Sequence, residues 1–391
     1  MRVNTLDEKY KSLVNDIGAN GIDKKDRTGT GSRSVFGRQI RHDMWEGFPL
    51  LTTKKIYWRG VVAELVWFLR GKSDLKFLLD HKCEIWVGDA YKKYSDHYAG
   101  YEGVPDRNWF IHEIMHNEKF AQQWGDLGPI YGRQWRDWNG YYETRIKNER
   151  DKGGYLIYEK QHIPGIDQIR NLIRELKTDP DSRRLLVNAW QPEQLRDMIL
   201  PPCHHGFQVW TRELTLKERF ALWEKRPDKD VLDFPIGPLE DMTDAIYHNT
   251  LDQIGVQRRA ISLMWHQRSA DVPLGLPFNI ASYGLLLEIL GTIVNMVPDQ
   301  LIGNLGDCHI YNNQIEGITE QLRRDRHPLP TLSINTEFWL TESGECGVGD
   351  LDAEACINAF FDDDFCNSFI NDNIELIGYH SEPGIKIPLS N

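Results

Sequence analysis

The amino-acid sequence predicts an α+β protein. Segments with apolar residues at helical spacing alternate irregularly with short apolar strands, without the regular strand–helix–strand units of a doubly wound sheet. The run Gly29-Thr30-Gly31 is too short for either glycine-rich nucleotide loop and is predicted to be a turn. With 391 residues, 40% of them hydrophobic, the chain can build a large core in one big domain or two ordinary ones.

The first part of the chain is predicted to form a helix, a strand and a second helix-like apolar segment. Apolar residues from Leu6 to Ile17 recur at helical spacing, and Ser34 to Arg41 reads as a strand. The segment from Tyr57 to Leu69 is strongly apolar and contains one carboxylate, Glu64. This residue is either a solvated charge on a helix face or a partly buried carboxyl with a raised pKa.

Three further elements follow in the second half. Ile166 to Lys177 is predicted as an amphipathic helix that stops at Asp179-Pro180-Asp181, because proline cannot continue the pattern. Leu185 to Trp190 is predicted as a short strand. Ile280 to Val297 is almost wholly apolar, so we expect a central, buried helix there.

The acidic segment from Asp352 to Asp364 has a helical pattern, and its start is similar to a calcium-binding loop. Such a loop needs glycine at its sixth position and glutamate at its twelfth. The chain has Ala355 and Phe361 at those places, so calcium binding is not expected.

Two stretches read as insertions, at about residues 87–123 and 211–259, and neither contains repeats or low complexity. The second insertion separates two segments that both read as core strands. We therefore expect a single catalytic domain over residues 1–391, interrupted by these two insertions.

Composition limits the classes of partner and the cellular compartment. A net charge of −12 disfavours direct binding to DNA, which needs an extended basic face. The six cysteines are sparse and irregularly spaced, so we expect reduced thiols rather than disulfides or a zinc ribbon. No run of eighteen apolar residues and no N-terminal apolar segment is present, which predicts a cytoplasmic protein without membrane contact.

One short motif is interpreted as a coincidence. His112 and His116 enclose Glu113 at the spacing of zinc-protease helices, in which two histidines one turn apart bind the metal. The longer form of that motif has glycine and a third histidine further along, where this chain has Lys119 and Gln122. We expect an exposed helix carrying two histidines and no metal site.

Three runs combine chemistry that suits a phosphorylated small molecule. Cys203 follows two prolines in Leu200–His204, and the other runs are Trp265–Asp271 and Leu276–Asn279. A thiolate attacks electron-poor carbon only when nearby positive charge lowers its pKa. Arg268 can supply that charge and can also bind a phosphate through its bidentate guanidinium. Together these residues indicate covalent catalysis.

A series of ordered motifs resembles the thymidylate synthase family. They cover most of the chain apart from the two insertions and residues 332–369. The similar runs are Asp26–Gly31, Gly47–Lys55, Glu64–Leu69, Asp126–Trp135, Asp179–Arg184, Pro202–His204, Gln267–Asp271, Leu276–Tyr283 and Gly306–Tyr311. The resemblance implies a thymidylate synthase-like fold with helices around a large mixed β-sheet that forms the interface of a homodimer.

The resemblance also implies the catalytic residues. Cys203 matches the nucleophile that adds to C6 of a pyrimidine nucleotide, and Arg268 is placed to favour its thiolate. Glu64 matches the acid–base residue that organises water near C4 and C5, while Tyr131 matches the tyrosine that assists proton removal from C5. Asp271 matches the residue that anchors the pterin ring of the folate.

The residues implied to bind the nucleotide include phosphate, sugar and base contacts. Arg183 and Arg184 match a pair contributed across the dimer interface. Asn279 favours dUMP, because an amide can donate to O4 and accept from N3–H, whereas a carboxylate would suit cytosine. The full set is Arg27, Arg183, Arg184, His204, Arg268, Ser269, Asn279, His309 and Tyr311.

The co-substrate implied by the resemblance is 5,10-methylenetetrahydrofolate. Lys54 and Trp86 match folate-cleft residues, together with Asp271, and no metal is implied. Lys55 is a further candidate for the entrance of the cleft, where a lysine can attract this polyanion.

The family includes synthases, which form dTMP and dihydrofolate, and bacteriophage enzymes that add water to give a 5-hydroxymethyl nucleotide. Four departures from the synthase pattern favour 5-hydroxymethyl-dUMP as the product, with dTMP as the alternative. They are Val87-Gly88-Asp89 in place of a second cleft tryptophan, the polar C-terminal residue Asn391, His205-Gly206 after the nucleophile, and the insertion at 211–259. A poorly sealed site would admit water.

Overall fold

The computed structural model describes residues 4–25, 29–101, 103–150, 156–226, 243–335 and 353–390. The chain forms two compact units. The first comprises Met1–Leu65, Ile173–Leu186 and Cys203–Asn391, and the second comprises Val66–Leu172 and Val187–Pro202. A single catalytic domain with two insertions stays a prediction.

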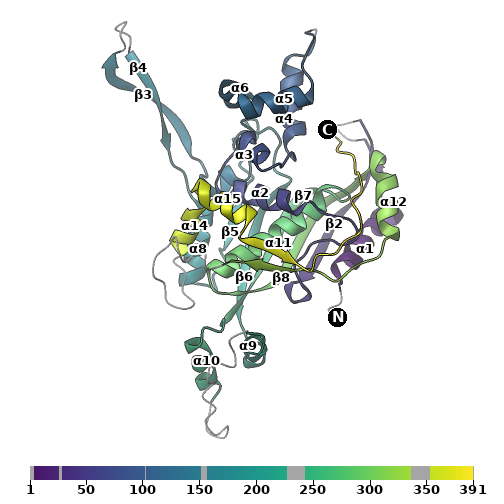
Figure 1. Ribbon diagram of the computed structural model, residues 1–391, viewed down its shortest axis with the longest axis vertical. Helices are drawn as coiled ribbons and strands as arrows, with labels where there is room; N and C mark the ends of the chain where they lie inside the picture. The colour runs from purple at the N-terminus through teal and green to yellow at the C-terminus, as the bar shows by residue number, and fades with distance from the viewer. Residues whose placement is uncertain are drawn as a thin grey trace. The chain divides into compact units, whose positions relative to one another are not determined.

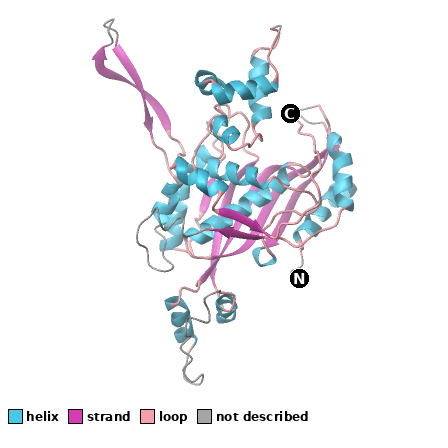
Figure 2. Ribbon diagram, in the orientation of Figure 1, coloured by secondary structure: helices cyan, strands magenta, loops and turns pink. Residues whose placement is uncertain are grey.

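The first unit is built on the sheet drawn in magenta in Figure 2, which has six strands in the order β1-β2-β8-β7-β6-β5. Strands β7 and β8 pair in parallel, whereas β1–β2, β2–β8 and β6–β7 pair antiparallel, so the mixed α+β architecture is confirmed. The strands are β1 Ile22–Lys24, β2 Ser32–Asp43, β5 Leu186–Asn188, β6 His204–Glu213, β7 Arg259–Asp271 and β8 Val297–Tyr311.

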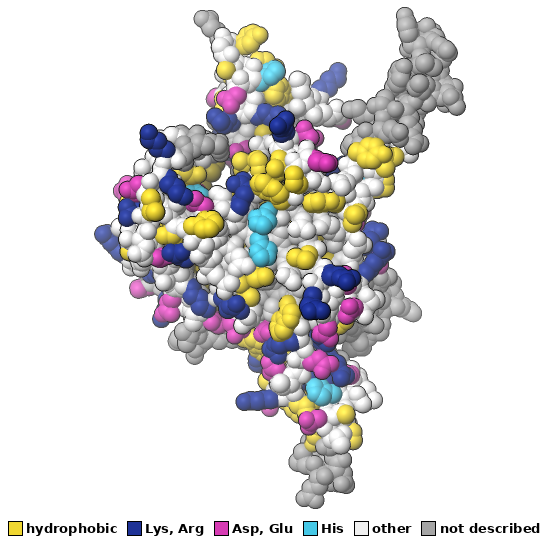
Figure 3. Space-filling model, turned by 180° about the vertical axis from the view of Figure 1, so that it is seen from behind, with side chains coloured by type: hydrophobic (Ala, Val, Ile, Leu, Met, Phe, Trp, Pro, Cys, Tyr) yellow, Lys and Arg dark blue, Asp and Glu magenta, His cyan; other side chains and the backbone are white. Residues whose placement is uncertain are grey.

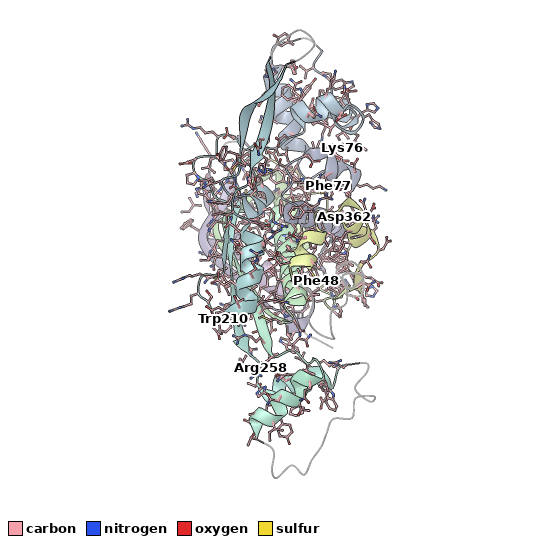
Figure 4. The ribbon with its side chains drawn as sticks, turned by 90° about the vertical axis from the view of Figure 1, so that its left-hand side faces the viewer. Phe48, Lys76, Phe77, Trp210, Arg258 and Asp362 are labelled. Carbon is pink, nitrogen blue, oxygen red and sulfur yellow. The ribbon has the colours of Figure 1, made fainter. Side chains whose placement is uncertain are left out.

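The apolar helix expected at 280–297 is α11 (Gly275–Ile293), which packs on β7 and β8 (Figure 1). It is long and apolar enough to cross a membrane, but 78% of its apolar window is buried, which identifies it as a core helix. It also packs closely against the segment before α2: a Cβ on Gly284 would lie 2.4 Å from Cγ of Pro49. Phe48, labelled in Figure 4, stacks edge-on against Trp58 at 5.1 Å.

The other predicted elements are present with shifted ends. Helix α1 spans Leu6–Asn20 and packs on β2, α2 spans Trp58–Leu69, and α8 spans Gln168–Thr178. The strand predicted over 185–190 is the shorter β5. The remaining elements of the first unit are η1 Met44–Glu46, α9 Leu216–Trp223, α10 Asp244–Gln253, η3 Asn312–Gln314, α12 Ile315–Arg323, β9 Thr331–Ile334, α14 Ala353–Ala359, α15 Asp363–Asn371 and β10 Ile374–Ile377.

The continuous helix expected over 352–364 is wrong. Two helices occur instead, and the chain leaves helical geometry between them. The carboxylate of Asp362 accepts a hydrogen bond from the backbone N–H of Phe365 at 2.8 Å, which caps the start of α15. The capping residue thus begins a new helix rather than extending the old one.

The region expected as the second insertion joins two long strands of the sheet. Strand β6 continues to Glu213 and β7 begins at Arg259, so both strands extend to the ends of the predicted insertion. Between them, Arg219 of α9 is fully buried and donates hydrogen bonds to Asp252 and to the carbonyl of Val256 at 2.6 and 2.8 Å. These bonds hold α9 and α10 together.

The second unit contains α3 Leu75–Asp80, α4 Val87–His97, α5 Arg107–His116, α6 Glu118–Trp124, α7 Gly132–Arg136, and the hairpin of β3 Tyr141–Arg150 and β4 Leu156–Ile163. The stretch expected as the first insertion forms α4–α6, which share an aromatic core around Tyr94. Its ring lies 5.3 Å from that of Phe110 and 5.2 Å from that of Trp124. Rings at these separations contribute beyond simple area burial.

The two histidines of the zinc-protease-like motif lie on α5, with ring centroids 4.4 Å apart. Nδ1 of His116 lies 2.8 Å from the carbonyl oxygen of His112, within the same helix. Among the residues that the structure describes, no group of three or more His, Cys, Asp or Glu side chains could hold a metal ion.

Candidate active site

The strand order brings predicted nucleotide-binding residues of the first unit together at one end of the strands. The start of β6 lies beside the end of β7, because His204 pairs with Gln267. The ends of the parallel strands β7 and β8 coincide, because Asp271 pairs with His309. The start of β2 is also there, since Ser32 pairs with Tyr311. Segments far apart in sequence therefore present their chemistry at one place.

Cys203 is a half-buried cysteine directly before β6, and it forms no disulfide. Its carbonyl oxygen accepts a hydrogen bond of 2.8 Å from the backbone N–H of Arg268, whose side chain is exposed. The pairing places the predicted nucleophile and the predicted phosphate-binding arginine at facing positions of adjacent strands. A guanidinium beside a thiol favours its thiolate form and offers a bidentate site for an oxyanion.

Two hydrogen bonds in series fix the orientation of Asn279 on α11. The indole N–H of Trp265 donates to Oε1 of Gln267 at 3.1 Å, and an indole N–H is a donor only. The amide nitrogen Nε2 of Gln267 is therefore on the other side, where it donates to Oδ1 of Asn279 at 3.1 Å. The oxygen and nitrogen of Asn279 thus have assigned positions, which a lone asparagine amide would lack.

His204 is buried, and its Nδ1 forms a hydrogen bond of 2.9 Å with the hydroxyl of Tyr283 on α11. Burial, and secondarily the neighbouring His205, lowers the pKa of His204 to about 3, so the ring is neutral near pH 7. Tyr283 in turn stacks on Trp265, with ring centroids 5.3 Å apart. His204 thereby belongs to the same packed group as the Trp265–Gln267–Asn279 chain.

Asp271 and Lys54 lie near one another in the interior. Oδ1 of Asp271 accepts from the backbone N–H of Leu274 at 3.0 Å, and Oδ2 accepts from Nε2 of Gln314 at 3.0 Å. Nζ of Lys54 donates to the carbonyl oxygen of Pro273. Burial lowers the pKa of Lys54 to about 8, against the opposing attraction of Asp271. A carboxylate acceptor and a cation at one site suit a ligand with ring N–H groups and carboxylates.

The last residues of β8 include His309 and Tyr311, whose rings meet edge to face with centroids 4.9 Å apart. Nδ1 of His309 lies 3.3 Å from Oδ1 of Asp307, a contact that orients the imidazole. The structure therefore brings this predicted pair together. Ser269, on β7, is half-buried and pairs in register with Asp307.

The remaining predicted residues of the first unit differ in exposure. Glu64 on α2 is 7% exposed, so its carboxyl is buried rather than solvated. Arg183 and Arg184 are both exposed in the loop after α8. Arg27 lies outside the described residues.

Trp86 and Tyr131 belong to the second unit and lie together there, with ring centroids 5.7 Å apart. Tyr131 also stacks on Phe68 at 5.0 Å. Its backbone has φ +30°, an unusual value for an aromatic residue, directly before α7. Such strain is retained where the surrounding packing requires one side-chain position, and it is common at functional sites.

Two glutamines at the site carry roles that the sequence did not indicate. Gln267 fixes the amide of Asn279, and Gln314 binds the carboxylate of Asp271. Gln267 is the first residue of the run Gln267–Asp271, so its place in a predicted functional motif was a usable signal. Gln314 follows the last motif, and nothing local marks it.

The comparisons with known proteins agree with this geometry. The family model for thymidylate synthase matches residues 8–225 and 246–391. A protein named thymidylate synthase from Malacoplasma penetrans is 33% identical over 380 residues, which cover 97% of this chain and 98% of the relative.

Two further relatives carry the same name. One from Listeria monocytogenes serotype 4a is 34% identical over 405 residues, covering 98% of this chain and 99% of the relative. One from Phytoplasma mali is 36% identical over 328 residues, covering 84% and 89%. With a family model over most of its length and such relatives, this chain belongs to the thymidylate synthase family.

Proposed function

We propose that the protein is a thymidylate synthase, which converts dUMP to dTMP with 5,10-methylenetetrahydrofolate as donor. The observation that carries this proposal is that relatives named thymidylate synthase align over 97–98% of the chain. The long segment at 211–259 lies within that aligned length, although the family model leaves residues 226–245 of it unmatched, so it weighs less against a synthase. Hydroxymethylation, favoured by the sequence alone, rests on the other three departures.

The proposed reaction begins at Cys203. Its thiolate bonds to C6 of the uracil ring, and the electron pair of the C5–C6 double bond moves toward C5 and the O4 carbonyl. Arg268 acts twice, since its positive charge favours the thiolate and its guanidinium binds the 5′-phosphate. The backbone hydrogen bond between these residues keeps the two groups at facing strand positions.

Asn279 selects the base. With Oδ1 already turned toward Gln267, its second lone pair accepts from N3–H of uracil and its Nδ2 donates to O4. Cytosine presents the opposite pattern at both atoms, so an amide held this way disfavours dCMP. His309 and Tyr311 bind the 3′-hydroxyl in this proposal, and Ser269 assists at the phosphate.

The remaining residues manage protons and the folate. Glu64, buried on α2, organises water near C4, and Tyr131 assists removal of the C5 proton. Asp271 accepts from the pterin ring, while Lys54 and Trp86 line the folate cleft. The folate supplies the one-carbon unit and, in a synthase, the hydride that completes the methyl group.

We also propose a homodimer in which Arg183 and Arg184 reach the phosphate of the neighbouring subunit. Both side chains are exposed on the first unit, as this arrangement requires. On the sheet, Phe36 of β2 is 79% exposed and Trp210 of β6 is 57% exposed. Figure 3 shows further hydrophobic side chains among basic, acidic and histidine ones on one face of the molecule. A second copy packed over β2 and β6 would bury both aromatic rings.

The test is to incubate the purified protein with dUMP and 5,10-methylenetetrahydrofolate. We expect dihydrofolate absorbance to rise in step with nucleotide conversion, and the nucleotide product to have the mass of dTMP. A product with the mass of 5-hydroxymethyl-dUMP and no dihydrofolate would overturn the proposal in favour of hydroxymethylation.

A matched variant tests the covalent step. Cys203→Ser should bind dUMP and give no turnover, and it should form no adduct with 5-fluoro-dUMP and the folate, whereas the unaltered protein forms one on Cys203. Turnover by Cys203→Ser would exclude the mechanism, and loss of activity with a chelator would point to metal chemistry instead.

A further inference from the structure

Gln314 occupies an unusual position between the folate-binding carboxylate and the C-terminal segment. Its side chain is fully buried at the end of η3. Nε2 donates to Oδ2 of Asp271 and to the carbonyl oxygen of Pro388, each at 3.0 Å. Oε1 accepts from the backbone N–H of Tyr311 at 3.1 Å. The bond to Tyr311 fixes which end of the amide is the donor, since a backbone N–H cannot accept.

The C-terminal segment also contacts the residues on both sides of Gln314. The hydroxyl of Ser390 lies 3.2 Å from Oδ1 of Asn313. Ile387 is buried, and a Cβ added to Gly317 would lie only 2.6 Å from its Cδ1. The absence of a side chain at Gly317 therefore allows the segment to pack directly on α12, with the carbonyl of Pro388 over the Gln314 amide.

Three titratable residues from other parts of the chain lie around Asp271. Lys54 and His309 favour its ionised form, and Tyr10 on α1 lies close enough for Asp271 to raise the pKa of its phenol. Burial has the largest effect and raises the pKa of Asp271, whereas the Gln314 hydrogen bond opposes it. A carboxylate in this position depends on its few donors to remain an ionised acceptor.

We propose that Gln314 is a positioning residue that couples docking of the C-terminal segment to the orientation of the Asp271 carboxylate. Each N–H of the amide serves one partner. When Pro388 leaves, one N–H of the buried amide loses its acceptor, and the amide can turn away from Asp271. The inference rests on the proposed function, because it assigns Asp271 the role of holding the folate.

The test compares Gln314→Leu with Gln321→Leu. Gln321 is the matched control, since it is also fully buried, lies one helix further along, and donates to Oγ1 of Thr53 at 3.0 Å without contacting Asp271. In Gln314→Leu we expect kcat/KM for the folate to fall roughly tenfold or more, the size of a lost hydrogen bond to a charged group. The KM for dUMP should change little.

The pH profile separates positioning from general destabilisation. Removing the Gln314 donor raises the pKa of Asp271, so the acid limb of kcat/KM for the folate should move to higher pH in Gln314→Leu. It should stay in place in Gln321→Leu. A tenfold loss with an unmoved acid limb, or an equal shift in both variants, would overturn the proposal.

Docking is measured without turnover. Hydrogen exchange of the backbone amides in residues 384–390 should be faster in Gln314→Leu than in the unaltered protein, and should match the unaltered protein in Gln321→Leu. Unchanged exchange would refute the coupling even in a fully active enzyme. Conversely, accelerated exchange in Gln314→Leu of a protein that does not convert dUMP would support the contact between Gln314 and the C-terminal segment. It would refute only the proposed reaction.

Discussion

Nε2 of Gln267 donates a hydrogen bond of 3.1 Å to Oδ1 of Asn279, twelve residues further along the chain. This one contact determines how the Asn279 amide faces a pyrimidine base. Since Gln267 is itself oriented by the indole N–H of Trp265, selection of the base depends on residues that need not touch it.

Substituting Gln267 with leucine should weaken selection of uracil. Without the Nε2 donor, the Asn279 amide can turn and present its oxygen to the amino group of cytosine. We expect kcat/KM for dUMP to fall about tenfold, the effect of losing a buried hydrogen bond worth about 1–2 kcal/mol. The ratio of dCMP binding to dUMP binding should rise, measured by isothermal titration. An unaltered ratio would show that Asn279 is oriented by other contacts.

Replacing Gly303 with alanine should disturb the packing of Trp265, which orients Gln267. Gly303 on β8 pairs with Trp265, and its added Cβ would lie 2.3 Å from the indole ring. Overpacking of this kind destabilises by about 1–3 kcal/mol, seen as a lower melting temperature. The same substitution at Gly18 on α1 is the control, because nothing lies within 4 Å of its Cβ. Gly18→Ala should raise stability by up to about 1 kcal/mol.

Much of the fold could be predicted because the relevant signals are local. Apolar spacing located α1 and α8, and continuous hydrophobicity located α11. The start of α11 was placed too late, at Ile280. Proline is tolerated in a first turn, where its missing N–H has no helical partner, and the helix begins at Gly275.

The site residues divide into those that local motifs indicate and those that only tertiary packing places. Motif runs indicated Cys203, Arg268 and Asn279. The pairing of β6 with β7 then places Cys203 beside Arg268, and the hydrogen bond from Gln267 joins Asn279 to β7. Gln314 could not be found, because its partners Asp271 and Pro388 are 43 and 74 residues away in sequence. Such contacts exist only once β7, η3 and the C-terminal segment are packed, and no local pattern encodes them.

Stability should fall in mild acid because His204 is buried in its neutral form. Its pKa is about 3 when folded and 6.5 when unfolded, so between these values only the unfolded chain takes up the proton. The unfolding free energy should therefore drop by about 1.4 kcal/mol for each pH unit below about 6.5, as far as this residue contributes.

Denaturant titrations at several pH values measure this dependence. His204→Asn removes the group, so its curve should be shallower than that of the unaltered protein between pH 6.5 and pH 4 or so. His112→Asn is the control, because His112 is two-thirds exposed on α5 and should leave the slope unchanged. Parallel curves for all three proteins would exclude His204 as a source of acid sensitivity.

Mixing two inactive variants should restore activity if the site is shared between subunits. Arg183 and Arg184 are exposed, whereas Cys203 is half-buried beside Arg268, so the two groups can belong to different protomers at one phosphate. In a dimer of Cys203→Ser with the double variant Arg183→Ala and Arg184→Ala, one site carries both substitutions and the other carries neither. Activity should therefore appear only after subunit exchange. Two variants that stay inactive when co-refolded, although mass spectrometry shows mixed dimers, would place both arginines in the site of their own subunit.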